Sequence, residues 1–155
     1  MIALMYYYDY RQFCDDVQTL SRQCSSFNAD TVLAVARGGV TLAHALSMAL
    51  DIRNLQSIRV ESYDGDTQRQ EVSILGECDL KGSKRILVVD DIVDSGRTLF
   101  HLMPKLQSSH PQCEFKVAAL FTKPSALTQP DFFLHEAREW IEFFWERDFL
   151  KTGSV

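Results

Sequence analysis

The sequence has 155 residues, of which 46% are hydrophobic and 24% are charged, and it carries a net charge of −5 at pH 7. This length and composition predict one globular domain spanning residues 1–155, with a sizeable core. The acidic balance argues against a general nucleic-acid binder, because such proteins need a surplus of Lys and Arg to neutralise phosphates.

The cellular compartment is indicated by the cysteines and by the absence of targeting segments. Four cysteines without Cys-x-x-Cys spacing favour reduced thiols and a cytoplasmic protein. No apolar run approaches the length of a membrane span, and the apolar N-terminus lacks the basic residues of a signal peptide. We therefore expect no transmembrane segment.

The first predicted element is a helix over Tyr10–Ser25. Asp9 is a suitable N-cap residue, and Phe13, Val17 and Leu20 recur at helical spacing on one face. This face is expected to pack on the core.

A buried strand is predicted over Thr31–Ala36, and an apolar helix over Val40–Leu50 follows it. Between them, Arg37, Gly38 and Gly39 form a short turn at the carboxyl end of the strand. Taken alone, the turn suits a surface arginine in a glycine turn as well as an anion site. Beside the motif described below, we favour the anion site.

The next segment predicts a long β-hairpin, with one strand over Leu55–Ser62 and a returning strand over Glu71–Leu75. Its polar tip carries Tyr63 and Arg69. Such a tip is either merely solvated or a mobile loop that closes over a labile substrate.

The most informative stretch begins with a continuous apolar strand over Ile86–Val89, typical of a strand buried on both faces of a parallel sheet. Asp90, Asp91 and Asp94 follow it. They are therefore expected at the carboxyl end of a central strand, where open α/β sheets bind ligands.

The same stretch continues with Ser95, Gly96, Arg97 and Thr98, which lead into a helix. Backbone N–H groups and hydroxyls at a helix N-terminus can cradle an anion, and a glycine allows close approach. Carboxylates beside such a cradle suit a sugar phosphate, because the acids can bind vicinal hydroxyls and Mg²⁺ while the loop binds the phosphate.

The remaining elements are a helix over Thr98–Gln107, which Pro104 should kink or interrupt, and a buried strand over Phe115–Phe121 that leads to Lys123. Many aromatic residues crowd the tail. This tail is expected either to cap the core or to form a lid whose aromatic rings stack on a planar base.

The segment Val88–Thr98 resembles the phosphoribosyl pyrophosphate (PRPP) signature of type I phosphoribosyltransferases. Shorter stretches are similar to parts of the bacterial xanthine-guanine (6-oxopurine) members of that family. These stretches are Ala36–Gly39 (pyrophosphate loop), Ser62–Arg69 (catalytic hairpin loop), Phe121–Pro124 (purine-contacting lysine) and Trp140–Glu142 with Trp145–Glu146 (base-binding tail).

The resemblance implies an α/β type I phosphoribosyltransferase fold: a parallel central sheet flanked by helices, with a mobile hairpin loop and a small C-terminal hood, mainly residues 123–155. The implied reaction transfers a 5-phosphoribosyl group from Mg²⁺-bound PRPP to N9 of guanine, xanthine or hypoxanthine and releases pyrophosphate. PRPP and the base are the implied partners, Mg²⁺ is the cofactor, and a homo-oligomer (dimer or tetramer) is expected.

The resemblance also assigns roles to residues that match the family motifs. Asp90 and Asp91 would hold ribose hydroxyls and the metal, and Asp94 would be the general base near the purine N7. The implied phosphate ligands are Ser95, Gly96, Arg97 and Thr98 for the 5′-phosphate, and Arg37, Gly38, Gly39 and Arg69 for pyrophosphate. Lys123 would donate to the purine 6-oxygen, Trp140 would stack on the base and the Ile141 backbone would bind its edge.

Arg97 stands where the family usually has a second glycine, and we expect its side chain to point outward while its N–H binds phosphate. Two alternatives stay open: a phosphoribosyltransferase for another nucleobase, and a PRPP-binding regulatory protein. Asp94, Arg69 and Lys123 argue against the regulator, because a sensor needs neither a general base nor a closing arginine.

Overall fold

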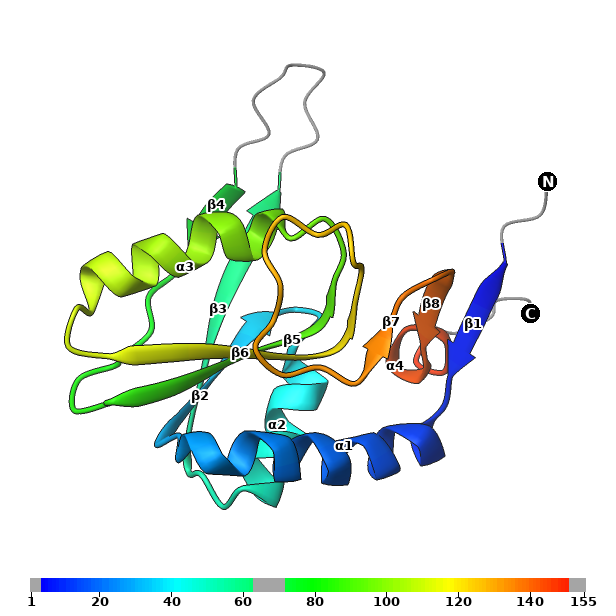
Figure 1. Cartoon of the computed structure of the whole chain (residues 1–155), viewed down its shortest axis with the longest axis horizontal. Coiled ribbons are helices and arrows are strands. Elements are labelled where there is room, and N and C mark those ends of the chain that lie inside the picture. The colour runs from blue at the N-terminus through cyan, green and yellow to red at the C-terminus, as the bar shows by residue number, and fades with distance from the viewer. Residues whose placement is uncertain (1–3, 63–71, 151–155) are drawn as a thin grey trace.

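The structure is a computed structural model that describes residues 4–62 and 72–150. Its centre is a six-stranded sheet made of β2 (Thr31–Ala36), β3 (Asn54–Ser62), β4 (Val72–Leu75), β5 (Arg85–Val93), β6 (Glu114–Thr122) and β7 (His135–Glu136). The strand order is β4-β3-β2-β5-β6-β7 (Figure 1). All neighbouring pairs are parallel except β3–β4. The predicted parallel α/β sheet and its antiparallel hairpin are confirmed.

Helices cover both faces of this sheet (Figure 1), which explains why its central strands are continuously apolar. The helices α1 (Tyr10–Cys24) and α2 (Val40–Ala49) lie on one face, and α3 (Arg97–Ser109) lies on the other. Within β2, Val32 and Ala34 point into the core under α1 and α2, whereas Leu33 and Val35 point into the core under α3.

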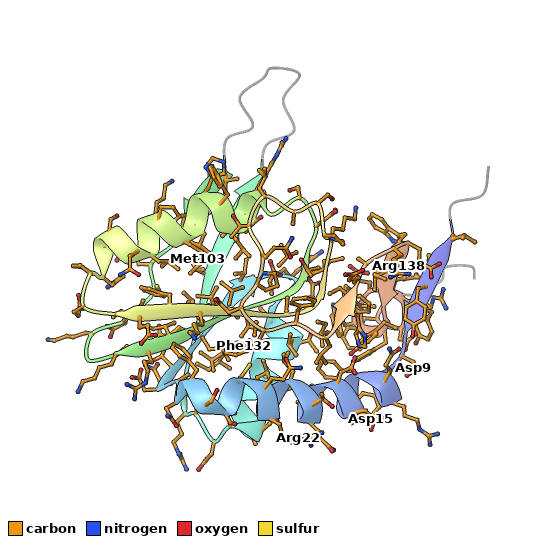
Figure 2. The ribbon with its side chains drawn as sticks, in the orientation of Figure 1. Asp9, Asp15, Arg22, Met103, Phe132 and Arg138 are labelled. Atoms are coloured by element: carbon orange, nitrogen blue, oxygen red, sulfur yellow. The ribbon has the colours of Figure 1, made fainter. Side chains whose placement is uncertain are left out.

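The helix α1 begins as predicted, since the Asp9 side chain accepts a hydrogen bond from the Gln12 N–H (2.8 Å). Its apolar residues Phe13, Val17 and Leu20 are buried. Figure 2 shows Asp15 on the outer side of the same helix, away from the sheet. The chain leaves α1 through a short 3₁₀ helix, η1 (Ser25–Phe27).

The helix α3 continues past Pro104 as one element, so Pro104 does not interrupt it, and the alternative of a kink stays a prediction. Proline removes one backbone donor from a helix, but it does not remove the side chains that pack it. Leu99, Leu102 and Leu106 are buried against the sheet on both sides of the proline. Tertiary packing therefore holds both parts of the helix.

A smaller unit at one end of the sheet, the hood, combines both ends of the described chain (Figure 1). It contains a two-stranded parallel sheet of β1 (Met5–Tyr8) and β8 (Trp140–Phe143), followed by α4 (Phe144–Arg147). No strand is predicted over Met5–Tyr8 from the sequence alone, because its partner lies more than a hundred residues later in the chain.

Aromatic packing attaches the hood to the sheet. The Tyr8 ring is fully buried, with its centroid 5.4 Å from the Phe121 ring of β6 and 5.6 Å from the Phe143 ring of β8. The core under α1 and α2 therefore continues into the hood without a gap.

The tip of the β3–β4 hairpin, with Tyr63 and Arg69, lies outside the described residues, so a mobile loop there stays a prediction. Among the helices of residues 4–62 and 72–150, none is long and apolar enough to cross a membrane.

Candidate active site

The site is built around the carboxyl end of β5, which continues to Val93 and therefore includes Asp90 and Asp91. The strand predicted from sequence ended at Val89, before these two acids. Pairing with β6 extends it, because Asp90 pairs with Ala119 and Ile92 pairs with Phe121. The Asp90 carboxylate accepts the Asp91 N–H (2.9 Å), and the Asp91 carboxylate accepts the Ile92 N–H (2.7 Å).

Electrostatics make this pair of carboxylates suitable for a cation. Burial, together with the neighbouring Asp91 carboxylate, holds the pKa of Asp90 well above its usual range, and burial likewise raises the pKa of Asp91. Within the described parts of the chain, neither carboxylate forms an ion pair. Buried carboxylates without a positive partner are costly, and a bound cation would remove that cost.

The donor set of Asp90 and Asp91 fits Mg²⁺ bound together with a phosphorylated substrate. Magnesium in such sites typically takes one or two carboxylates and completes its shell with phosphate oxygens and water. A cage of three or more His, Cys, Asp or Glu residues is not found in the described part of the protein. A metal here would complete its shell with oxygens of the substrate and of water.

The turn of Arg37, Gly38 and Gly39 lies directly against these acids. A Cβ atom on Gly38 would be 2.8 Å from the Asp91 carboxylate, and one on Gly39 would overlap the Val89 carbonyl oxygen. Only glycine allows this approach. The Ala36–Arg37 peptide bond is cis, and the Arg37 side chain is exposed. The tertiary structure thus brings the predicted pyrophosphate loop and the predicted metal ligands together.

The loop after Asp94 encloses a small hollow of about 90 Å³. Asp90, Asp94, Ser95, Gly96 and Thr98 contribute to its lining, whereas Arg97 does not. Gly96 has a φ of 79° and precedes the first residue of α3. The position of Arg97 agrees with the expectation that its side chain points away from the hollow. The Arg97 N–H donates to the Ser95 hydroxyl (3.3 Å).

A larger pocket of about 360 Å³ lies between the ends of β5 and β6 and the hood, within the usual size range of small-molecule sites. It gathers five of the residues predicted from sequence: Asp91, Asp94, Lys123, Trp140 and Ile141. Ile141 is buried, whereas 66% of the Trp140 surface is exposed.

Lys123 and Asp94 form an ion pair in this pocket, with 2.5 Å between the ammonium nitrogen and a carboxylate oxygen. The register of β5 and β6, which pairs Val93 with Thr122, places the two residues side by side. A hydrogen bond from the Lys123 N–H to the Val93 carbonyl (2.9 Å) extends that register by one residue. The pair offers a donor and an acceptor to one edge of a ligand.

Sequence reasoning missed two charged residues that line the same pocket, Arg138 and Glu139, and it gave Glu146 of the predicted base-binding tail no separate role. Figure 2 shows Arg138 in the hood. The available signal was the charge that flanks Trp140 and Trp145 in an otherwise aromatic tail. Arg69, by contrast, lies outside the described residues, so its predicted role stays untested.

The sequence pattern of the family described as "Phosphoribosyl transferase domain" matches residues 6–150. The chain therefore belongs to the phosphoribosyltransferase family, as the resemblance predicted. Among curated relatives, a xanthine-guanine phosphoribosyltransferase of Idiomarina loihiensis is 31% identical over 128 residues, covering 81% of this chain and 76% of that protein.

Solved structures agree with this assignment. A Helicobacter pylori xanthine-guanine-hypoxanthine phosphoribosyltransferase is 40% identical with a TM-score of 0.87, covering 94% of this chain and 96% of that one. A purine phosphoribosyltransferase from Pyrococcus horikoshii is 30% identical with a TM-score of 0.81, covering 97% of this chain and 99% of that one.

Proposed function

We propose that the protein is a purine-salvage enzyme that transfers the 5-phosphoribosyl group of Mg²⁺-bound PRPP to N9 of a 6-oxopurine and releases pyrophosphate. The observation that carries this proposal is the Lys123–Asp94 pair, which lies in a pocket beside the Ser95–Thr98 loop. Relatives named for guanine, xanthine and hypoxanthine support the substrate class.

The ion pair matches the chemistry of a 6-oxopurine edge. N7 and the 6-oxygen lie side by side on that edge, so Lys123 can donate to the oxygen while the Asp94 carboxylate accepts the N7 proton. A 6-amino group would instead face the ammonium and leave donors unpaired, which disfavours adenine. The exposed Trp140 ring is proposed to stack on the bound base, and the Ile141 backbone to bind its edge.

The phosphoribosyl side uses the two glycine-containing loops. Ser95, Gly96, Arg97 and Thr98 are proposed to hold the 5′-phosphate. Ser95, Gly96 and Thr98 line the small hollow at the start of α3, and a helix N-terminus offers backbone N–H groups to an anion. Arg37, Gly38, Gly39 and Arg69 are proposed to hold the departing pyrophosphate.

Bond cleavage develops positive charge on the sugar and negative charge on the leaving group. Arg37 and Arg69 would stabilise the negative charge, and Asp90 and Asp91 would hold the ribose hydroxyls. Bound Mg²⁺, held by the same two acids, would supply further neutralisation of the pyrophosphate.

We also propose a cytoplasmic location, because all four cysteines are free thiols, as is usual in a reducing compartment. A homo-oligomer, dimer or tetramer, is proposed as well. It is supported by exposed apolar side chains at the hood, such as Leu4 and Phe149.

The test is an assay of PRPP and Mg²⁺ with guanine, xanthine, hypoxanthine and adenine, comparing the wild type with Asp94→Asn. We expect nucleotide from a 6-oxopurine but not from adenine. The substitution should lower kcat by about 10²- to 10⁴-fold, the usual contribution of a general base.

Asp15→Asn is the matched control, because it removes an exposed carboxylate on the outer side of α1 (Figure 2). It should leave kcat unchanged. PRPP binding without turnover on any base would overturn the proposed function and favour a PRPP-binding regulator. Turnover of a different nucleobase alone would assign another phosphoribosyltransferase activity.

A further inference from the structure

The loop from Lys123 to Gln129 links the purine pocket to the loop that encloses the small hollow. It begins at Lys123, which lines the purine pocket. Four residues later, the Leu127 N–H donates to the Ser95 carbonyl oxygen (2.8 Å). One stretch of backbone therefore supports both proposed subsites.

The Lys123–Gln129 loop packs so closely against Gly96 that a movement of one loop must move the other. A Cβ atom on Gly96 would be 2.6 Å from the Thr128 nitrogen and 2.8 Å from the Leu127 nitrogen. Because no side chain separates the two loops, a shift of the Lys123–Gln129 loop must move the Ser95–Gly96 backbone as well.

The side chain of Gln129 stabilises this loop by hydrogen bonds to its residues. Its amide nitrogen is 2.9 Å from the Lys123 carbonyl oxygen and 3.3 Å from the Pro124 carbonyl oxygen, and its amide oxygen accepts the Thr122 hydroxyl at 2.9 Å. The orientation of the amide follows from chemistry, because the opposite orientation would face an oxygen toward two carbonyl oxygens.

We infer that Gln129 is a positioning residue that holds both the proposed 5′-phosphate loop (Ser95–Thr98) and Lys123 in place. This inference rests on the proposed function. Gln129 does not line either pocket. It acts through the Lys123 carbonyl, which it binds directly, and through the Ala126 carbonyl (3.4 Å). The Ala126 carbonyl belongs to the same peptide unit as the Leu127 N–H, which donates to the Ser95 carbonyl. Gln129 therefore supports both the residue proposed to recognise the base and the loop proposed to bind the 5′-phosphate.

The location of Gln129 makes the inference testable without loss of the fold. Its side chain is exposed and belongs to neither hydrophobic core. A substitution should therefore lower the unfolding temperature by about a few degrees at most, from the lost hydrogen bond of the buried Thr122 hydroxyl, while it releases the loop.

The experiment compares Gln129→Met, which keeps size and neutrality but has no amide, with Gln129→Glu, which keeps an acceptor for Thr122 but loses the donors. Gln107→Met is the matched control, because the Gln107 amide also donates to a backbone carbonyl, that of Cys113 (3.1 Å), at the far end of α3. For each protein, kcat, the KM for PRPP, the Kd for guanosine monophosphate, the Kd for Mg²⁺-pyrophosphate and the unfolding temperature are measured.

Both Gln129 variants should raise the KM for PRPP and the Kd for guanosine monophosphate by about three- to tenfold, the net effect of losing one or two hydrogen bonds. The Kd for Mg²⁺-pyrophosphate should stay within about twofold, because the Arg37–Gly39 loop has no bond to Gln129. The Gln107 control should change neither affinity.

The inference is overturned if all affinities change equally, if only Gln129→Glu weakens nucleotide binding, or if the unfolding temperature falls while the affinities hold. Failure of the proposed function is a separate result. In that case the wild type binds the nucleotide without turnover, and the comparison of nucleotide with pyrophosphate binding still decides the role of Gln129.

Discussion

At the scale of single residues, the contact between Gly38 and Asp91 makes a sharp prediction. A Cβ atom on Gly38 would be 2.8–3.0 Å from three atoms of the Asp91 carboxylate, so Gly38→Ala must displace a proposed metal ligand. We expect kcat/KM to fall by about 10²-fold, the order of loss that a displacement of about 1 Å causes in a preorganised site. Steady-state kinetics at saturating Mg²⁺ measure this loss.

Gly76→Ala is the control for Gly38→Ala. Gly76 has a φ of 84° but no atom within 4 Å of an added Cβ, so its substitution strains the backbone without any steric contact. This substitution should lower the free energy of unfolding by about 1 kcal/mol and leave kcat/KM unchanged. Equal kinetics for Gly38→Ala and the wild type would show that Asp91 does not need its observed position.

At the scale of secondary-structure elements, Asp30 joins the start of β2 to the start of β5. Its carboxylate accepts the backbone N–H groups of Lys84 (2.9 Å) and Arg85 (3.0 Å) and the hydroxyl of Thr31 (2.8 Å). Burial alone would raise the pKa of Asp30, but the backbone N–H of Arg85, the Thr31 hydroxyl and the N–H of Lys84 outweigh it and hold the pKa below its usual value.

A lowered carboxylate pKa stabilises the folded state above the pKa of the unfolded chain, about 3.9, and the stabilisation is lost as the pH falls through the folded-state value. Asp30→Asn should therefore lower the unfolding free energy at pH 7 by about 1 kcal/mol, the typical net value of a hydrogen bond to the backbone. The difference from the wild type should be smaller at pH 3.5. Urea titrations at both pH values measure it.

Asp15→Asn again provides the control, since Asp15 is exposed on the outer side of α1 (Figure 2). It should leave the unfolding free energy within about 0.5 kcal/mol of the wild type at both pH values. A difference for Asp30→Asn that grows as the pH falls would contradict the proposed role of its carboxylate.

At the scale of the whole molecule, we expect the hood and the sheet to unfold together as one domain. The hood shares its core with the sheet, since Tyr8 touches both Phe121 and Phe143. Both tryptophans of the chain lie in the hood, and the Trp145 ring stacks on Phe143 with centroids 4.5 Å apart. Trp140→Phe therefore leaves Trp145 as the only indole reporter.

In Trp140→Phe, urea unfolding followed by Trp145 fluorescence and by far-ultraviolet circular dichroism should give coincident midpoints, as a two-state domain requires. Fluorescence reports the hood, whereas circular dichroism reports mainly the helices and the central sheet. A fluorescence midpoint at lower urea would mean that the hood unfolds separately and that residues 1–155 are not one cooperative unit.

Local sequence patterns were sufficient for five of the six strands of the central sheet and for the chemistry near them, but not for β7. The apolar run Ile86–Val89 specified a buried strand, because its side chains must face apolar surroundings on both sides of a sheet. The acids Asp90, Asp91 and Asp94 are adjacent in the chain, so their placement at one strand end needed no knowledge of distant contacts. The same holds for the α1 cap at Asp9.

Only the tertiary structure decided which distant segments touch. The pairing of β1 with β8, the contact of Gly38 with Asp91 and the bond from Leu127 to the Ser95 carbonyl each join parts of the chain far apart in sequence. No periodicity encodes such contacts, because they arise from the register of parallel strands and from packing between elements. The sequence by itself therefore determined most of the sheet and the acidic motif, whereas the packing of the elements decided how the purine pocket and the phosphate loop are joined.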